Sequence, residues 1–186
     1  MAPTRFPRLV SLACHDLRTP LATVYGFART LTRDAQLDDR SRRFVSMIEQ
    51  ASEQMTQLLD ELGTAARIEA ARWEPGLRSV DTLELAACDD ERVEARGAGE
   101  TIETDAEAVG HGLDSLALAA VRHGPAERVV WDVRGRQLAL SPVQPAAAPV
   151  VTGDEPRDLG SLVARMVIEE LGGSLALEGD TLLVSL

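Results

Sequence analysis

The sequence predicts an α+β protein: an N-terminal helical hairpin that forms a dimeric four-helix bundle, followed by a small α/β sandwich. Two observations carry this prediction. Up to Arg72, apolar residues recur at alternating spacings of four and three, the heptad pattern of packed helices. After the helix-breaking stretch Trp73-Glu74-Pro75-Gly76, short strands alternate with two helical segments, an order typical of helices that cover a sheet. We therefore expect two domains, residues 1–74 and 75–186.

The first helix is expected from about Pro7 to Arg33. Its apolar seam consists of Phe6, Val10, Ala13, Leu17, Pro20, Val24, Phe27 and Leu31. His15 lies two residues from both Ala13 and Leu17, and at about 100° per residue it turns to the face opposite this seam. We therefore expect an exposed histidine. Pro20 removes one backbone donor and predicts a bend about one turn beyond it.

The second helix is expected from about Arg40 to Arg72, after a connection over Asp34–Asp39 in which Asp38 or Asp39 caps the helix. Its seam consists of Phe44, Ile48, Ala51, Met55, Leu58, Leu62 and Ala65. Two antiparallel helices bury two such seams poorly on their own. A second copy of the chain would complete a four-helix bundle. The alternative is a hairpin that packs on the C-terminal domain of its own chain.

The C-terminal half predicts strands and helices in alternation. Strands are expected at Glu91–Arg96, Glu100–Thr104, Arg128–Val133, Gln137–Leu140, Ser174–Glu178 and Thr181–Leu186. Helices are expected at Ala106–Arg122 and at Asp158–Leu171, the second ending at Gly172-Gly173. Turns lie near Gly135 and Gly179, and the Pro- and Ala-rich stretch Ser141–Pro156 is predicted to be a loop.

The composition argues against several classes of function. A formal net charge of −11 argues against a nucleic-acid partner, because binding a phosphate backbone requires clustered cations. Two cysteines, Cys14 and Cys88, are too few and too far apart for a disulfide framework or a metal site. No apolar run is long enough to span a bilayer and no signal-peptide core is present, which predicts a cytoplasmic protein without a membrane segment. The sequence also contains no lysine and no asparagine.

The stretch Cys14-His15-Asp16-Leu17-Arg18-Thr19-Pro20-Leu21 carries the candidate chemistry. It places a histidine, an adjacent carboxylate and a hydroxyl four residues later on one helix, a combination that suits phosphoryl chemistry on an imidazole. A neutral imidazole attacks phosphorus through one ring nitrogen when an acceptor holds the proton on the other. Asp16 is the candidate acceptor, and its alternative is a solvated surface charge.

This stretch resembles the H-box of the histidine-kinase superfamily, His-(Asp/Glu)-Leu-Arg-Thr-Pro-Leu, at every position. The resemblance implies that His15 carries a phosphoryl group and that Asp16 assists it. It also implies that Thr19 positions a water for dephosphorylating a partner's aspartyl phosphate; alternatively, the hydroxyl bonds a carbonyl of the preceding turn. Arg18 either attracts the phosphoryl group or pairs with an acid.

Small residues continue along the face that carries the histidine. At helical spacing from His15 these are Thr19, Ala22, Thr23 and Gly26. Short side chains would let another protein's surface approach the imidazole, as in-line phosphoryl transfer requires. The alternative is that they merely face solvent. His111 and His123, by contrast, are interpreted as ordinary residues, one inside the predicted helix and one at its end.

The C-terminal half resembles the ATP-binding domain of the same superfamily in eroded form, so that the resemblance covers nearly all of the chain. Where the family carries magnesium-binding asparagine, the aligned stretch is Ser115-Leu116-Ala117-Leu118-Ala119-Ala120-Val121-Arg122-His123. Ser141–Ala146 replaces the Asp-x-Gly-x-Gly motif, and only Asp158-Leu159-Gly160-Ser161-Leu162 remains of Gly-x-Gly-Leu-Gly-Leu. ATP binding is therefore not expected, and Mg²⁺ is expected at a partner's receiver domain instead.

These observations favour a two-component phosphorelay protein: a homodimeric histidine phosphotransferase that carries a phosphoryl group on His15 to or from receiver-domain aspartates, without its own ATP-dependent autokinase activity. The expected partners are a response-regulator receiver domain and, upstream, a hybrid histidine kinase. One alternative is a divergent sensor-kinase core that phosphorylates itself at His15. Another is a non-catalytic regulator that binds a kinase or a response regulator.

Overall fold

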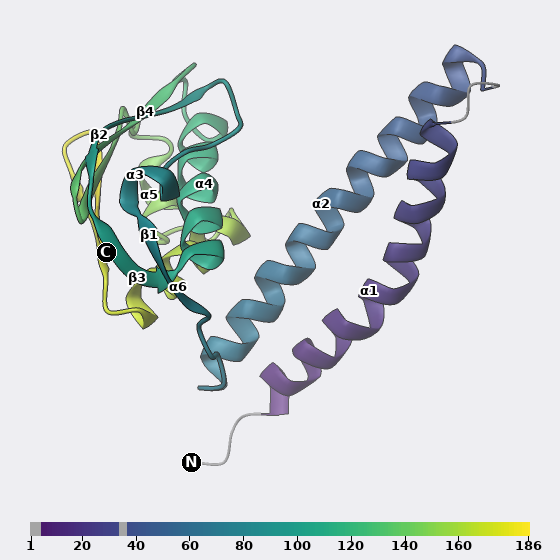
Figure 1. Ribbon diagram of the computed structural model, residues 1–186, viewed down its shortest axis with the longest axis horizontal. Coiled ribbons are helices and arrows are strands. Elements are labelled where there is room, and N and C mark those ends of the chain that lie inside the picture. Colours follow the sequence, from purple (N-terminus) through teal and green to yellow (C-terminus); the bar gives the residue numbers. More distant parts are fainter. Residues whose placement is uncertain (1–4, 34–36) are drawn as a thin grey trace. The chain divides into compact units, whose positions relative to one another are not determined.

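The computed structural model describes residues 5–33 and 37–186 and confirms the α+β class (Figure 1). Contacts divide the chain into two compact units, Met1–Trp73 and Glu74–Leu186. The first unit is a hairpin of α1 (Arg5–Thr32) and α2 (Asp39–Glu69), with bounds a few residues from those predicted. Asp38 caps α2 by accepting a hydrogen bond from the backbone N–H of Ser41 at 2.9 Å, whereas Asp34–Gln36 of the predicted connection lie outside the described residues.

The two helices of the hairpin meet along a line one residue away from the predicted apolar seam. Cys14 and Ala28 are buried on α1, and Val45 is buried on α2. Polar bonds follow the same line: Arg18 pairs with Asp60, the Tyr25 hydroxyl donates to Glu53 at 2.8 Å and the Thr32 hydroxyl donates to Glu49 at 3.1 Å. The internal contact of the hairpin is therefore made by small and polar side chains.

The large apolar side chains of the predicted seams remain at the surface of the single hairpin. Their exposed fractions include 53% for Leu17, 68% for Phe27 and 53% for Met55. Val24, Leu31, Phe44, Ile48, Leu58 and Leu62 are exposed as well. Exposed apolar residues in such a continuous heptad pattern are typical of a helix face that contacts another protein.

The second unit contains two sheets and four helices among its described residues. Its strands are β1 (Leu77–Asp81), β2 (Val93–Gly99), β3 (Thr101–Asp105), β4 (Val129–Gly135), β5 (Gln137–Ser141), β6 (Ser174–Glu178) and β7 (Thr181–Ser185). Its helices are α3 (Thr82–Leu85), α4 (Ala106–Arg122), α5 (Ala148–Val151) and α6 (Leu159–Glu170). β1 and α3 were not predicted, and α5 lies within the predicted loop Ser141–Pro156.

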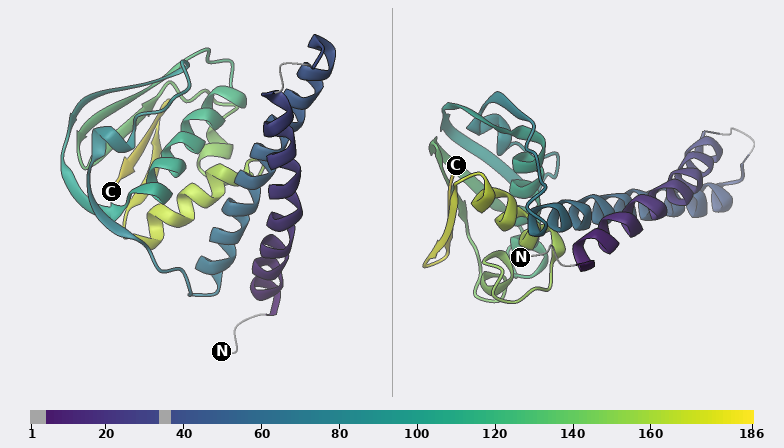
Figure 2. Two further views of the ribbon diagram at one scale, coloured as in Figure 1. Left: turned by 45° about the vertical axis from the view of Figure 1, so that its right-hand side comes forward. Right: turned by 90° about the horizontal axis from the view of Figure 1, so that it is seen from below.

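The main sheet has the strand order β2-β4-β5-β7-β6, and β1 pairs with β3 in a separate ladder. β2 and β4 run parallel, since β3 and α4 form the crossover between them, and the other pairs are antiparallel. Side chains alternate between a buried and a more exposed face: Trp131, Leu138, Leu140, Leu182 and Val184 are fully or almost fully buried. α4 and α6 lie side by side along this unit's sheet (Figure 2).

Two features join α4 to α6. Gly112 allows close packing, because a Cβ at this position would lie 3.2 Å from both Cα and Cβ of Ala164. Asp158 caps α6 by accepting from the Ser161 N–H at 3.0 Å, and the same carboxylate lies 3.1 Å from Arg122 at the end of α4. The Asp158 side chain is only 7% exposed, so this carboxylate is held between the helices.

We predict that Asp158→Ala lowers the free energy of unfolding by about 1–2 kcal/mol, because the variant loses the helix cap of α6 and also leaves Arg122 without its partner. Asp158→Asn keeps an oxygen that can accept from the Ser161 N–H and should cost clearly less. Urea denaturation of both variants measures the difference. Equal losses, or no loss in Asp158→Ala, would show that the cap does not stabilise this junction.

Candidate functional site

His15 projects from α1 into solvent, with 79% of its side chain exposed. Its Nδ1 lies 3.3 Å from Oδ1 of Asp16, whose side chain is 69% exposed. When the proton is on Nδ1, the carboxylate accepts a hydrogen bond from this nitrogen, and the lone pair on Nε2 is free to attack an electrophile. The predicted exposure of the histidine is therefore observed, and the structure brings His15 and Asp16 together.

Arg18 extends away from the imidazole toward α2. Its Nε and Nη2 lie 3.0 Å and 2.7 Å from Oδ1 of Asp60, and Nη2 donates to the Leu59 carbonyl at 3.4 Å. Gly63 makes room for this guanidinium, since a Cβ there would lie 3.3 Å from Nη2. The arrangement accounts for Arg18 as a bridge within the hairpin, and its role toward a phosphoryl group stays a prediction.

The small residues that follow His15 form a low, open surface on α1. Thr19, Ala22, Thr23 and Gly26 are all exposed. The Thr23 hydroxyl donates to the Thr19 carbonyl at 3.2 Å, so that part of this surface is occupied by an internal bond of the helix. At Gly26, nothing lies within 4 Å of where a Cβ would be. Another protein can therefore approach this side of the helix closely.

In the second unit, several of the positions aligned with the family's nucleotide motifs are buried or paired. Ser115 is 4% exposed and Ala119 is fully buried on α4. His123 Nε2 lies 3.5 Å from the Asp158 carboxylate that also pairs with Arg122. The short helix α5 packs against α4 and α6. The apolar side chains Val143, Ala147, Val150 and Val151, on and before α5, are each at most 2% exposed.

A separate polar cluster contains Cys88 and Asp114. Burial raises the pKa of the Cys88 thiol to about 11, and burial likewise raises the pKa of the Asp114 carboxyl. Oδ1 of Asp114 is buried without a hydrogen-bond partner in the described structure. A thiol with so high a pKa remains protonated at neutral pH and is a poor nucleophile and a poor metal ligand. Both cysteines are free.

Two further observations concern metal-binding groups and membrane-spanning helices. Within residues 5–33 and 37–186, no group of three or more His, Cys, Asp or Glu side chains is placed to hold a metal ion. In the same ranges, every helix is too short or too polar to cross a membrane.

Known proteins with similar sequences are histidine kinases or a domain of histidine kinases. Residues 8–71 match the His Kinase A (phospho-acceptor) domain. The uncharacterized sensor-like histidine kinase R01002 of Rhizobium meliloti is 36% identical over 92 residues, which cover 47% of this chain and 17% of that protein. Sensor histidine kinase YcbM of Bacillus subtilis is 20% identical over 207 residues, which cover 92% of this chain and 66% of that protein.

A solved structure of a longer protein contains the same fold. Full-length ShkA, crystallised in complex with AMPPNP, superposes with a TM-score of 0.66 and 23% sequence identity. The match covers 96% of this chain and 44% of ShkA. The chain thus spans less than two thirds of the length of each of these three proteins.

Proposed function

This chain belongs to the histidine kinase superfamily, and we propose that it acts in two-component signalling as a histidine phosphotransferase. In this role His15 carries a phosphoryl group to or from the aspartate of a receiver domain. The observation that carries the proposal is a contrast: the exposed imidazole keeps its carboxylate partner at 3.3 Å, while the aligned nucleotide positions hold buried side chains and an internal ion pair.

The transfer step follows from the geometry around His15. The Nε2 lone pair attacks phosphorus of the receiver's aspartyl phosphate, an N–P bond forms, and the P–O bond to the receiver carboxylate breaks with its electron pair. Asp16 holds the Nδ1 proton throughout and stabilises the positive charge that develops on the ring. Return of the phosphoryl group to a receiver is the reverse of this step.

The open surface at Ala22 and Gly26 supports docking of the receiver beside the imidazole. In-line attack requires the entering nitrogen and the leaving oxygen to approach opposite sides of phosphorus, which bulky neighbours would hinder. Thr19 lies one turn from His15, where its hydroxyl can orient a water toward the partner's aspartyl phosphate. This second activity, hydrolysis of the partner's aspartyl phosphate, would remove phosphate from the pathway rather than transfer it.

The side chains of the second unit argue against an ATP-dependent autokinase. Ser115 and Ala119 lack the carboxamide oxygen that the resemblance assigns to a magnesium ligand, and no asparagine exists elsewhere in the chain. The Asp158 carboxylate is already engaged by Arg122 and by the N-terminus of α6. These residues do not fit a magnesium nucleotide. The second unit is then a scaffold or docking surface, and Mg²⁺ belongs to the partner's receiver site.

A homodimer is part of the same proposal. The exposed apolar side chains of α1 and α2 repeat with heptad spacing on both helices of the hairpin. A second copy presents the same two stripes, so that a two-fold axis pairs them in a four-helix bundle. Burial of these side chains from both copies would stabilise the hairpin, whose internal contact is mainly small and polar.

The phosphotransfer proposal is tested with receiver domains from the same organism, charged with ³²P from labelled acetyl phosphate and mixed with the full chain. We expect acid-labile label on the chain, none on His15→Ala, and uptake slowed roughly ten- to a hundredfold in Asp16→Asn, because the Nδ1 proton loses its charged acceptor. Asp39→Asn, the same change on an exposed carboxylate of α2, should transfer normally. Label that remains on every receiver, or that reaches His15→Ala equally, contradicts the proposal.

The dimer is tested by light scattering of Phe27→Glu, which places a charge within the exposed stripe. The unmodified chain should have twice its mass of 20.0 kDa, whereas Phe27→Glu should be a monomer, because burying an unpaired carboxylate is costly. Ala22→Glu adds the same charge on the opposite side of α1 and should remain dimeric. A monomeric unmodified chain at high micromolar concentration, or a dimeric Phe27→Glu variant, would refute the pairing.

A further inference from the structure

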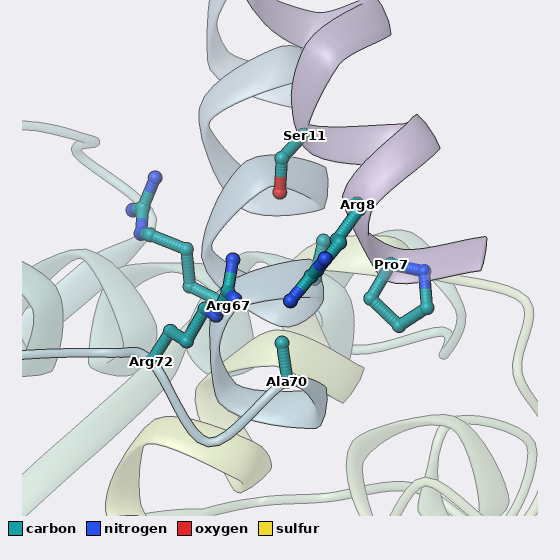
Figure 3. A pocket seen from close by; sticks show the side chains of 7 residues that line it. Pro7, Arg8, Ser11, Arg67, Ala70 and Arg72 are labelled. Carbon is teal, nitrogen blue, oxygen red and sulfur yellow. The ribbon is translucent and has the colours of Figure 1, made fainter. Parts of the chain in front are cut away.

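A pocket of about 320 Å³ lies in the hairpin between the first turns of α1 and the last turns of α2 (Figure 3). Arg8 and Ser11 line it from α1, and Arg67 and Arg72 line it from the end of α2. Pro7, Ala66 and Ala70 add an apolar part of the wall. None of the lining residues is acidic, although the chain as a whole has 30 Asp and Glu residues against 19 Arg.

The arginines of this pocket differ from those elsewhere in the structure. Many described arginines, such as Arg18 and Arg92, pair with a carboxylate. Arg67 donates instead to the Thr64 hydroxyl at 2.9 Å. Within residues 5–33 and 37–186, no carboxylate lies within ion-pair distance of Arg8 or Arg72. The pocket therefore brings together three arginines with no acidic residue in its lining.

Arg8 occupies a position at which the helix dipole disfavours a cation. It lies in the first turn of α1, which contains no acidic residue. The N-terminus of a helix carries partial positive charge, so a cation there is unfavourable by roughly 0.3–1 kcal/mol unless an anion is close. An anion bound in the pocket would offset this unfavourable interaction between Arg8 and the N-terminus of α1.

Helix capping explains only part of the arginine cluster at the end of α2. Cations are favourable at a helix C-terminus, and Arg67 lies in the last turn of α2. However, the backbone already caps this end: the Arg72 N–H donates to the Arg67 carbonyl at 2.9 Å and the Ala71 N–H donates to the Ile68 carbonyl at 2.8 Å. The capping bonds do not involve the Arg72 guanidinium, and capping does not explain the position of Arg8.

We propose that this pocket binds a small molecule that bears a phosphate monoester. The guanidinium groups of the lining can only donate and the Ser11 hydroxyl can donate as well, which matches a doubly charged tetrahedral oxyanion. The volume is at the small end of the range for small-molecule sites and exceeds what inorganic phosphate alone requires. The apolar wall of Pro7 and Ala70 would contact the organic part of the ester. Neither His15 nor its phosphorylation takes part in this binding.

Calorimetric titration of the full chain with phenyl phosphate tests the proposal, with inorganic phosphate and sulfate as parallel titrants at constant ionic strength. We expect saturable binding of phenyl phosphate, and weaker binding of inorganic phosphate, which lacks an apolar group. Arg8→Gln and Arg72→Gln should each weaken binding by about tenfold or more, since each removes a charged hydrogen-bond donor. Arg43→Gln, an exposed arginine of α2 outside the pocket, should bind normally, and so should His15→Ala.

Several results would overturn the proposal. One is the absence of saturable binding of phenyl phosphate at millimolar concentration, and another is equal binding by Arg8→Gln, Arg72→Gln and the unmodified chain. Sulfate that binds as tightly as phenyl phosphate would indicate a nonspecific anion site. Binding of a phosphorylated protein surface but not of phenyl phosphate would also refute it. Because His15→Ala retains the pocket, failure of the phosphotransfer proposal leaves this result unaffected.

Discussion

The proposed chemistry depends on one contact, the 3.3 Å approach of the Asp16 carboxylate to Nδ1 of His15. An imidazole can act as a nucleophile only when one nitrogen keeps its lone pair, and Asp16 determines which one by accepting a hydrogen bond from the other, protonated nitrogen. The helix supplies the remaining conditions. It turns His15 into solvent, away from the buried line of Cys14 and Ala28, and it leaves small side chains along the approach.

The core of the second unit lies on the inward face of its sheet, with Trp131 and its neighbours. Asp158 joins Arg122 to α6, and the apolar residues on and before α5 are packed into the interior. All of these contacts are made within the unit. Under the proposed function, such a domain would serve as a scaffold or a docking surface.

Much of the fold could be predicted from local pattern. α4 has the predicted bounds Ala106–Arg122, because Asp105 caps it immediately before that segment and its apolar residues all lie within it. β1 was missed, since Leu77–Asp81 is short and mostly exposed and becomes a strand only by pairing with β3. The inner face of the hairpin was also missed, because small and polar residues give a weaker signal than the apolar stripe beside it. The ion pair of Arg18 with Asp60 joins residues too distant in sequence for a local pattern to predict.

The central claim is that His15 receives its phosphoryl group from another protein and not from ATP. Incubation of the purified full chain with Mg-[γ-³²P]ATP, followed by measurement of acid-labile label, tests it most directly. We predict no label above that of His15→Ala, even after long incubation, because serine and alanine stand where the family carries magnesium-binding asparagine. Stoichiometric label that His15→Ala lacks would contradict this account and identify the chain as a divergent autokinase.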